Sequence, residues 1–516
     1  MRQKYRNLKL LDRRLISLFL LIFSLDTFAQ YQDRQWYLYD GLNTVVMDYN
    51  NDSLRIVTKP HYPTPTYTYS SICDSTGKVS FLNNNFSLTD SSFIRVQNTT
   101  DINTDISAPV TWNGHIILDF PNSDKVVCVR TLMENIGAMP PFGGDYFQTK
   151  AYLTYIDKYE NLGLGQAVPG KELIQVVDDT LCLPVAACRH ANGSDWWIVI
   201  RKFRSNKFFI ILVTPNGYSV KEQVIGLNLP LIYGVAGKSM FSNDGKTFVF
   251  GVSLGNRFDI PPWYFDVFDF DRCSGTFSNQ RKINIIDPYA ARVQGVAISP
   301  NNRYLYVGLT RKLFQYDLWA TNLDSSRIFI DTAAFNSYVG DMRLAPDGKI
   351  YITPSWIGHN LSTIEHPDSV GLACGYRINS VELGSACGAY CFPNMPCFTL
   401  GADTTAFGCD TISTVGLDIV KDVKSNIVLF PNPVKETLYI SFEQTNSQFD
   451  KVSHAIIYDE IGSVLMEQDF NVSKNCFVNE DMYSVDVNSL NSGMYFIKLV
   501  NKNNKLIATS RFIKAE

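Results

Sequence analysis

Short apolar segments separated by polar turns recur along most of this chain. Residues 342–352 show the pattern most clearly, with an apolar strand, a Pro346-Asp347-Gly348 turn and a second strand. The same arrangement occurs at residues 241–251 and 298–308, and paired segments around such turns predict β-hairpins. Short β-branched and aromatic runs dominate, and a helical period is missing between residues 35 and 398. We therefore predict an all-β fold built from a repeated hairpin.

The spacing of these hairpins indicates the architecture. Ser242, Ser299 and Ala345 occupy equivalent turns and lie 57 and 46 positions apart, close to the period of about 40–50 residues in known propeller repeats. A single blade leaves its sheet uncovered, so blades must stack around an axis. We predict a β-propeller of about seven blades in residues 30–398. A pair of β-sandwiches is the alternative, but its strands would recur every ~8–12 residues.

Several segments of this region also resemble a known group. These segments are residues 190–197, 268–275, 344–351, 371–374 and 392–394. They are similar to a group of exported, propeller-like proteins from Bacteroidetes. The resemblance implies a secreted propeller and no particular activity.

A second, smaller domain follows a change in composition. Residues 399–425 lose aromatic side chains and gather Thr, Ser, Gly and Asp, which is typical of a linker. Apolar residues then alternate at Leu438, Ile440 and Phe442, and this alternation predicts strands. Seven or so short strands in residues 426–516 favour a small Ig-like β-sandwich.

Three blocks in this second domain carry a closer resemblance. Residues 429–434, 457–462 and 490–498 resemble the C-terminal sorting domain (type A) of the type IX secretion system. The resemblance implies export by the type IX secretion machinery, removal of the domain by a sortase-like peptidase, and either release or linkage to a lipopolysaccharide anchor. The residues that it identifies as the sorting signal are Pro431, Asn432, Pro433, Gly462, Gly493, Tyr495, Lys498 and Lys514.

The N-terminus has the parts of a secretory signal peptide. Six basic residues lie between Arg2 and Arg14, an apolar run covers residues 15–25, and the small residues Thr27 and Ala29 follow. The run is about half of the ~20 residues that span a bilayer, which argues against a membrane anchor. We predict that residues 1–29 are removed and that the mature protein passes through the periplasm. It would then be secreted or held at the outer cell surface, with no transmembrane span.

Charge and composition narrow the class of partner. The chain has 46 basic and 50 acidic residues, a formal charge of −4, and so lacks the basic surplus of nucleic-acid-binding proteins. Apolar residues make up 45% of the chain, enough for large cores in two or more domains. We predict an unknown extracellular ligand and no nucleic-acid partner.

All 11 cysteines follow the signal peptide, so disulfide bonds are the expected state after export. A metal knuckle formed by Cys387, Cys391 and Cys397 is the alternative. No His lies among these cysteines, however, and their spacing matches no common zinc pattern. We predict no metal site, and the pairing stays open. The disulfide candidates are Cys182, Cys188, Cys374, Cys387, Cys391, Cys397 and Cys409.

One polar and aromatic cluster is a candidate ligand-binding site. His190, Asn192 and Asp195 precede Trp196 and Trp197, which offer a stacking face for a sugar or a peptide. Adjacent residues on a strand point to opposite faces, so at least one of the two tryptophans is expected to pack between blades. We predict that His190, Asn192, Asp195 and Trp196 bind the ligand.

The sequence predicts no catalytic residues and no cofactor. Asp266, Asp269 and Asp271 could serve acid-base chemistry or calcium binding, but they match no calcium loop and precede a turn. The six His are scattered, and the sequence contains no zinc-protease helix, nucleophile elbow or glycine-rich phosphate loop.

These features favour an exported binding or display module for a glycan, peptide or protein. The first alternative is a propeller hydrolase or lactonase, which needs four or more carboxylates or His from different blades at one mouth of the central channel. The second is a structural surface component or adhesin, which predicts broad exposed aromatic patches.

Overall fold

The computed structural model divides the chain into two compact units, residues 1–414 and 415–516. The described residues contain no helix that is long and apolar enough to cross a bilayer. The predicted signal peptide and most of the predicted linker lie outside the described residues. The structure describes residues 31–39, 43–50, 53–60, 69–104, 113–121, 123–136, 146–182, 184–226, 228, 236–253, 263–285, 293–309, 311–332, 339–354, 359–384, 391–403, 409, 427–442, 452–459, 464–470, 477–479, 482–501 and 506–515.

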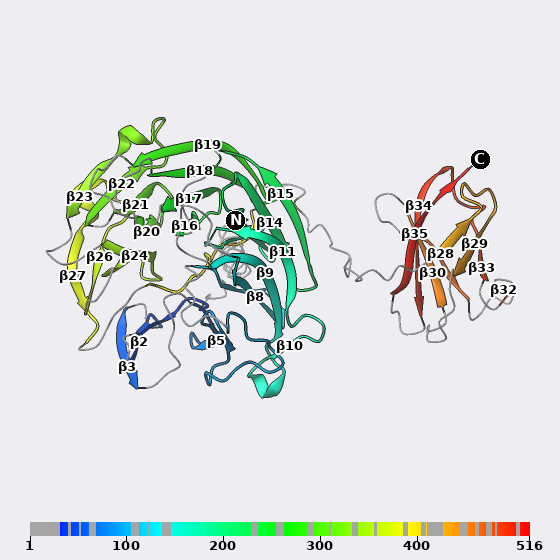
Figure 1. The fold of residues 1–516 in the computed structure, drawn as a ribbon, viewed down its shortest axis with the longest axis horizontal. Helices are drawn as coiled ribbons and strands as arrows, with labels where there is room; N and C mark the ends of the chain where they lie inside the picture. The colour runs from blue at the N-terminus through cyan, green and yellow to red at the C-terminus, as the bar shows by residue number, and fades with distance from the viewer. Residues whose placement is uncertain are drawn as a thin grey trace, which may run out of the picture. The chain divides into compact units, whose positions relative to one another are not determined.

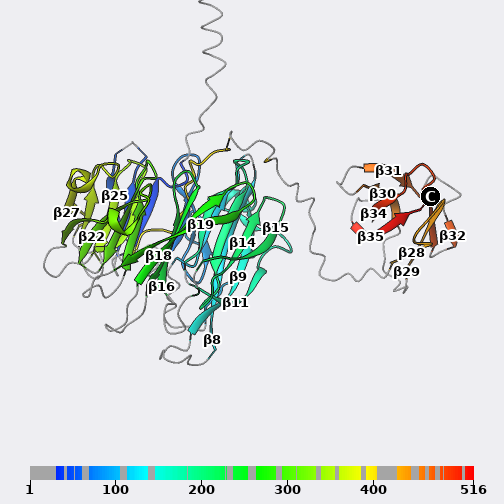
Figure 2. The same ribbon diagram turned by 90° about the horizontal axis from the view of Figure 1, so that it is seen from above.

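Seven antiparallel sheets form the described part of the first unit. They follow one another in chain order around a common centre (Figure 1), and their strands run through the thickness of this ring (Figure 2). Strands are ordered in each sheet as in the sequence, except that β11 pairs with β9 in the third sheet. The first strands of most neighbouring sheets contact one another, so they line the inside of the ring. The predicted all-β fold class is confirmed.

The strands of the first unit fall into sheets β1–β3, β4–β6, β7–β11, β12–β15, β16–β19, β20–β23 and β24–β27. Their bounds are β1 Gln35–Tyr39, β2 Asn43–Asp48, β3 Arg55–Pro60, β4 Ser70–Cys73, β5 Val79–Asn83, β6 Leu88–Thr89, β7 Ile116–Asp119, β8 Lys125–Asn135, β9 Tyr146–Asp157, β10 Gln166–Ala167, β11 Ile174–Leu181, β12 Ala186–Arg189, β13 Trp196–Arg201, β14 Lys207–Val213, β15 Tyr218–Val224, β16 Ala236–Phe241, β17 Thr247–Ser253, β18 Trp263–Asp271, β19 Thr276–Ile285, β20 Val293–Ile298, β21 Tyr304–Leu309, β22 Lys312–Asp317, β23 Ile328–Thr332, β24 Val339–Leu344, β25 Ile350–Pro354, β26 Asn360–Ile364 and β27 Tyr376–Glu382. Three short 3₁₀ turns connect them: η1 Asn161–Gly163, η2 Asp324–Ser326 and η3 Gly371–Cys374.

The repeated hairpin joins the first and second strands of several sheets. In the seventh sheet, Leu344 of β24 pairs with Ile350 of β25, and the backbone N–H of Ala345 donates to the carbonyl of Lys349 across the turn. Gly348 has a φ of 80°, which a residue with a Cβ adopts only with strain. Asp347 accepts a hydrogen bond from the backbone N–H of Lys349. The turn chemistry seen in the sequence therefore fixes this hairpin.

Aromatic packing joins the first sheet to the seventh. The ring of Trp36 in β1 lies 6.5 Å from that of Tyr351 in β25, and Tyr49 lies 6.0 Å from the same ring. All three residues belong to one hydrophobic core together with buried residues of the third and fourth sheets. The two ends of the series of sheets are thereby held together.

A buried ion pair lies between the fourth and fifth sheets. Arg201 of β13 donates to the carboxylate of Asp266 in β18 at 2.8 Å, and both side chains are fully buried. The guanidinium also lies over the rings of Phe208 and Phe250, and the second carboxylate oxygen of Asp266 accepts from Gln280 at 2.7 Å. Asp266 therefore contributes to packing between sheets.

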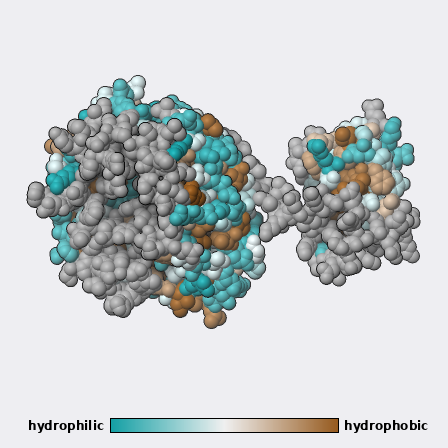
Figure 3. Space-filling view, in the orientation of Figure 1, coloured by the Kyte–Doolittle hydropathy of each residue, from teal (hydrophilic) through white to brown (hydrophobic). Residues whose placement is uncertain are grey.

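The second unit contains two four-stranded sheets in its described residues, ordered β28-β29-β33-β32 and β31-β30-β34-β35. Buried side chains of both sheets share one core. The visible coloured part of its surface, like that of the first unit, mixes hydrophilic and hydrophobic residues (Figure 3). The strands are β28 Ile427–Phe430, β29 Thr437–Phe442, β30 Val452–Tyr458, β31 Val464–Asp469, β32 Phe477–Asn479, β33 Met482–Asp486, β34 Gly493–Asn501 and β35 Leu506–Lys514.

Candidate functional site

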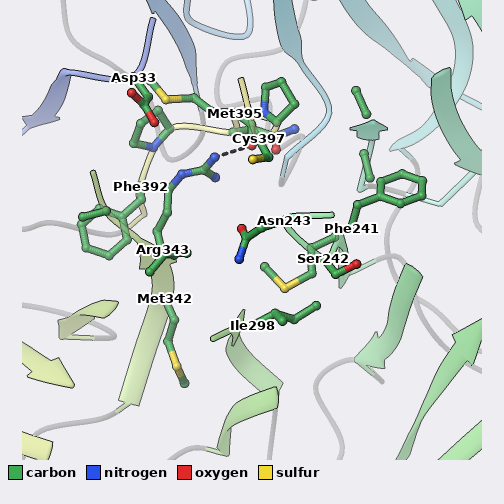
Figure 4. A pocket seen from close by; sticks show the side chains of 18 of the residues that line it. Asp33, Phe241, Ser242, Asn243, Ile298, Met342, Arg343, Phe392, Met395 and Cys397 are labelled. Atoms are coloured by element: carbon green, nitrogen blue, oxygen red, sulfur yellow. Dashed lines mark hydrogen bonds between the residues drawn. The ribbon is translucent and has the colours of Figure 1, made fainter. Parts of the chain in front are cut away.

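A cavity of about 380 Å³ lies inside the ring and is the candidate site. Its walls include residues of the innermost strands β1, β7, β12, β16, β20 and β24, so six of the seven sheets contribute to it. Figure 4 shows the side chains of Asn243, Ile298, Met342 and Arg343 around this space. The repeat architecture creates the cavity, because innermost strands from different sheets converge there.

Lys238 and Asp341 provide a buried ion pair in the cavity wall. The Nζ atom of Lys238 lies 2.7 Å from Oδ1 of Asp341. Oδ2 of Asp341 accepts from the backbone N–H of Phe392 at 3.0 Å, and Oδ1 accepts from that of Met342 at 3.0 Å. The carboxylate of Asp341 thus has a cation and two amide donors, which is the satisfied state that a buried charge requires.

Arg343 and Asp33 add a second pair of opposite charges to the lining. Burial lowers the pKa of the Arg343 guanidinium, while the carboxylates of Asp341 and Asp33 act in the opposite direction. Burial raises the pKa of the Asp33 carboxyl, an effect that the cations of Arg343 and Arg34 partly offset. With two cationic and two acidic side chains, the described lining is balanced in charge.

The segment of residues 391–403, here called the central segment, forms one side of the cavity. Arg343 donates to the carbonyl of Met395 (Figure 4), and Asn394 reaches the carbonyls of His115 and Val185, each at 2.9 Å. Further hydrogen bonds come from arginines of the fourth and fifth sheets, Arg189 to Phe398 and Arg272 to Gly401. These contacts tie the central segment to four sheets, although it contains no strand and its last residues fall in the predicted linker.

One polar atom of a residue in the cavity wall has no hydrogen-bond partner among the described residues. Oγ of Ser239 in β16 is shielded from solvent, and no described residue forms a hydrogen bond with it. Apolar side chains, among them Met240, Ile298 and Phe392, form much of the remaining lining. Apolar walls with a few placed polar groups are the usual composition of a small-molecule site.

The four predicted ligand-binding residues lie in and after the first hairpin turn of the fourth sheet. Asn192 donates to the carboxylate of Asp195 at 2.8 Å, and a ring nitrogen of His190 lies 3.0 Å from the carbonyl oxygen of Cys273. Trp196 is fully buried, its Nε1 donates to the carbonyl of Asp119, and its ring lies under the guanidinium of Arg189. His190 and Asp195 are buried as well, and only Asn192 is partly exposed. Ligand binding by this group stays a prediction.

The structure contains one disulfide among its described residues, between Cys273 and Cys409. Cys409 was a predicted candidate, whereas Cys273, 136 positions away, was not. Cys387 lies outside the described residues. The described candidates with free thiols are Cys182, Cys188, Cys374 and Cys397, and the remaining described candidate, Cys391, is buried.

The predicted sorting residues occupy connected positions in the second unit. Oδ1 of Asn432 accepts from the backbone N–H of Ile513 at 2.8 Å, so the segment after β28 is fastened to β35. Tyr495 stacks on Phe512 and donates to the carbonyl of Asn491 at 2.8 Å. Pro431, Pro433, Gly493, Lys498 and Lys514 lie in or beside strands β28, β34 and β35, and Gly462 lies outside the described residues.

Sequence reasoning missed Lys238, Asp341 and Arg343. A signal was present, because Lys238 and Asp341 each lie four residues before an equivalent turn residue, Ser242 and Ala345. Aligning the repeats on these turns would have placed both charges on the innermost strands. The pairing of Lys238 with Asp341 depends on how the sheets are arranged in the ring, and an alignment of the repeats does not show this arrangement.

Comparisons with known proteins identify the second unit. Residues 428–514 match the family described as the secretion system C-terminal sorting domain. The predicted type IX sorting domain is thereby confirmed, and with it export to the cell surface or beyond. No curated protein matches the chain.

Solved structures similar to the chain include three bacterial proteins. A putative 6-phosphogluconolactonase from Bacteroides uniformis has 11% identity and a TM-score of 0.43, over 70% of this chain and 99% of its own. AztD from Citrobacter koseri has 12% identity and a TM-score of 0.35, over 69% and 87%. PorZ, a type IX secretion component of Porphyromonas gingivalis, has 9% identity and a TM-score of 0.25, over 94% and 74%. At these values the likeness carries no functional argument.

Proposed function

We propose that the first unit is an exported binding module that takes a small ligand in its central cavity. The observation that carries the proposal is the cavity itself, whose described lining combines apolar side chains, polar groups, a balanced set of charges and the residue Ser239, the Oγ of which is unpaired among the described residues. Such a lining suits a neutral ligand with both apolar and hydrogen-bonding groups, such as a sugar or a short peptide.

The lining favours binding over hydrolysis. A hydrolase or lactonase at the channel would need several carboxylates or His from different blades. The described lining residues include two carboxylates, Asp33 and Asp341, and no His. Asp341 is engaged by Lys238 and by two backbone amides. This leaves one carboxyl for chemistry, fewer than the enzyme alternative requires.

A glycan and peptide array with the mature protein tests the proposal. Ser239→Leu places a larger side chain in the cavity wall and should abolish the binding of at least one ligand found on the array. Ser219→Leu, on the exposed strand β15, is the matched control and should bind like the wild type. Equal binding by Ser239→Leu, with an unchanged melting temperature, would place the ligand elsewhere and refute the proposal.

We further propose that a sortase-like peptidase removes the second unit after export, and that the first unit is then released or linked to a lipopolysaccharide anchor. The match at residues 428–514 supports handling by the type IX machinery. Intact-mass measurement of the extracellular protein tests the cleavage, because the mature chain should end before Ile427. A mass that includes residues 427–516 would contradict it.

A further inference from the structure

Trp319 is the exposed tryptophan among those whose burial the structure describes. Its side chain is 66% exposed, whereas Trp36, Trp196 and Trp197 are buried. It lies in the turn that follows β22 in the sixth sheet. Exposure of so large an apolar ring costs hydration free energy, so a ring held in the open is a candidate contact for a ligand.

Neighbouring side chains hold the indole ring in place. The guanidinium of Arg303 lies over the Trp319 ring, 5.3 Å from its centroid, and over the Tyr304 ring at 5.2 Å. Three hydrogen bonds, of 3.2, 3.1 and 2.8 Å, fix Arg303 to the carboxylate of Asp317. The same carboxylate accepts from the backbone N–H of Trp319 at 3.0 Å. The ring is thus preorganised, with the guanidinium over it and 66% of the residue exposed.

The residues around Trp319 that the structure describes favour one class of ligand. Thr321, Asn322 and Asp324, which follow in the same turn, are exposed polar residues. The next exposed apolar residue of this sheet is Phe329. It pairs with Phe314, and Phe314 precedes Trp319 by five positions in the chain. Stable protein interfaces bury about 800 Å² on each partner and use several clustered anchors. A single aromatic ring surrounded by polar groups is too small for that role.

We propose that Trp319 is a stacking platform for one pyranose ring of a glycan. The axial C–H groups of a sugar pack on the open face of the indole, and its equatorial hydroxyls reach polar side chains at the rim. Thr321 and Asn322, which are exposed in the same turn, are the candidates for that role. This site lies in the sixth sheet, outside the lining of the central cavity, and does not depend on the function proposed for the cavity.

Calorimetric titration of the mature protein with neutral hexaoses of β-1,4-glucose, β-1,4-N-acetylglucosamine, β-1,4-xylose and α-1,6-mannose tests the platform. At least one should bind, and Trp319→Ala should weaken it about tenfold or more. Trp319→Tyr keeps an aromatic face and should retain most of the affinity, which separates loss of the platform from loss of the fold. Tyr159→Ala, which removes another exposed ring, is the matched control.

Three results would overturn the proposal. The first is that none of the four hexaoses binds, and the second is that Trp319→Ala binds as tightly as the wild type. The third is that the wild type self-associates and Trp319→Ala abolishes the association without changing sugar binding, which would make Trp319 a protein contact. Ser239→Leu should leave this binding unchanged, so a loss there would assign the sugar to the cavity instead.

Discussion

Lys238 and Asp341 form a buried ion pair, with 2.7 Å between Nζ and Oδ1, although a whole sheet separates the two sheets that carry them. The equivalent position of the intervening strand β20 is Gly295. A Cβ added to Gly295 would lie 2.3 Å from the carbonyl oxygen of Gly340 in β24. Because Gly295 has no side chain, β20 can approach β24 closely. This brings Lys238 of β16, on one side of β20, within reach of Asp341 of β24, on the other.

Substitution Lys238→Met should lower the free energy of unfolding by about 3–5 kcal/mol, because it leaves a buried carboxylate without its cation. Lys207→Met, which breaks the more exposed pair with Glu222, should cost less than about 1 kcal/mol. Urea unfolding of the mature protein measures both. Equal losses for the two variants would mean that the Lys238–Asp341 pair contributes no more than a surface pair.

Substitution Gly295→Ala tests the close approach of β20 and β24. The added methyl group meets backbone atoms, which cannot rotate away, so we expect a loss of about 1–3 kcal/mol of stability. Gly217→Ala is the matched control, because its Cβ would meet nothing within 4 Å. A melting temperature of Gly295→Ala that equals that of the control would contradict the packing described here.

The hairpins and the aromatic, β-branched strands could be predicted from the sequence because their signals are local. Pro346, Asp347 and Gly348 each stabilise the turn in which they lie. The sequence also predicted the second unit, since alternation and three motif blocks lie within residues 426–516. These features depend on neighbours a few positions away, and the fold class follows from their repetition.

The candidate site could not be predicted in the same way, because it is made of contacts between repeats. Lys238 and Asp341 are 103 positions apart, and the disulfide joins residues 136 positions apart. The pair Trp196-Trp197 stood out in the sequence, but it begins a strand that is buried along its whole length. A run that is apolar at every position, such as residues 196–200, is typical of a strand covered on both faces.

Acid should destabilise the first unit through His115. Burial lowers the pKa of this imidazole to about 3, and Arg130 contributes in the same direction. The unfolded chain binds the proton near pH 6.5, so between pH 6.5 and pH 3 it binds more protons than the folded protein. Stability is therefore complete above pH 6.5 and should fall by up to about 1.4 kcal/mol per pH unit below it.

Urea midpoints of the wild type and of His115→Gln, measured between pH 4.5 and pH 8, check this expectation. The difference between the two proteins should stay constant above pH 6.5, which serves as the internal control, and shrink below it. A difference that does not change with pH would exclude His115 as a source of the acid sensitivity.

The described cysteines should divide into one disulfide and a set of thiols that react slowly. Burial raises the pKa of Cys128, Cys182 and Cys188 to about 12, so few thiolates form at neutral pH. Alkylation of the native protein followed by peptide mapping should therefore leave these three unlabelled and label them in urea. Mapping should also recover a peptide pair joined through Cys273 and Cys409, and Cys273→Ser should cost about 2–5 kcal/mol. Rapid labelling of the three thiols in the native protein would contradict their burial.

Removal of residues 428–516 should keep the protein inside the cell envelope, because it deletes the segment that matches the sorting domain. In a bacterium with a type IX system, fractionation should find the full chain outside and the truncated chain in the periplasm. The first unit has its own cores, and its disulfide ends at Cys409, so the truncation should leave it folded. Its melting temperature after purification is the control. A truncated chain that reaches the medium as efficiently as the full chain would show that another part of the molecule directs export.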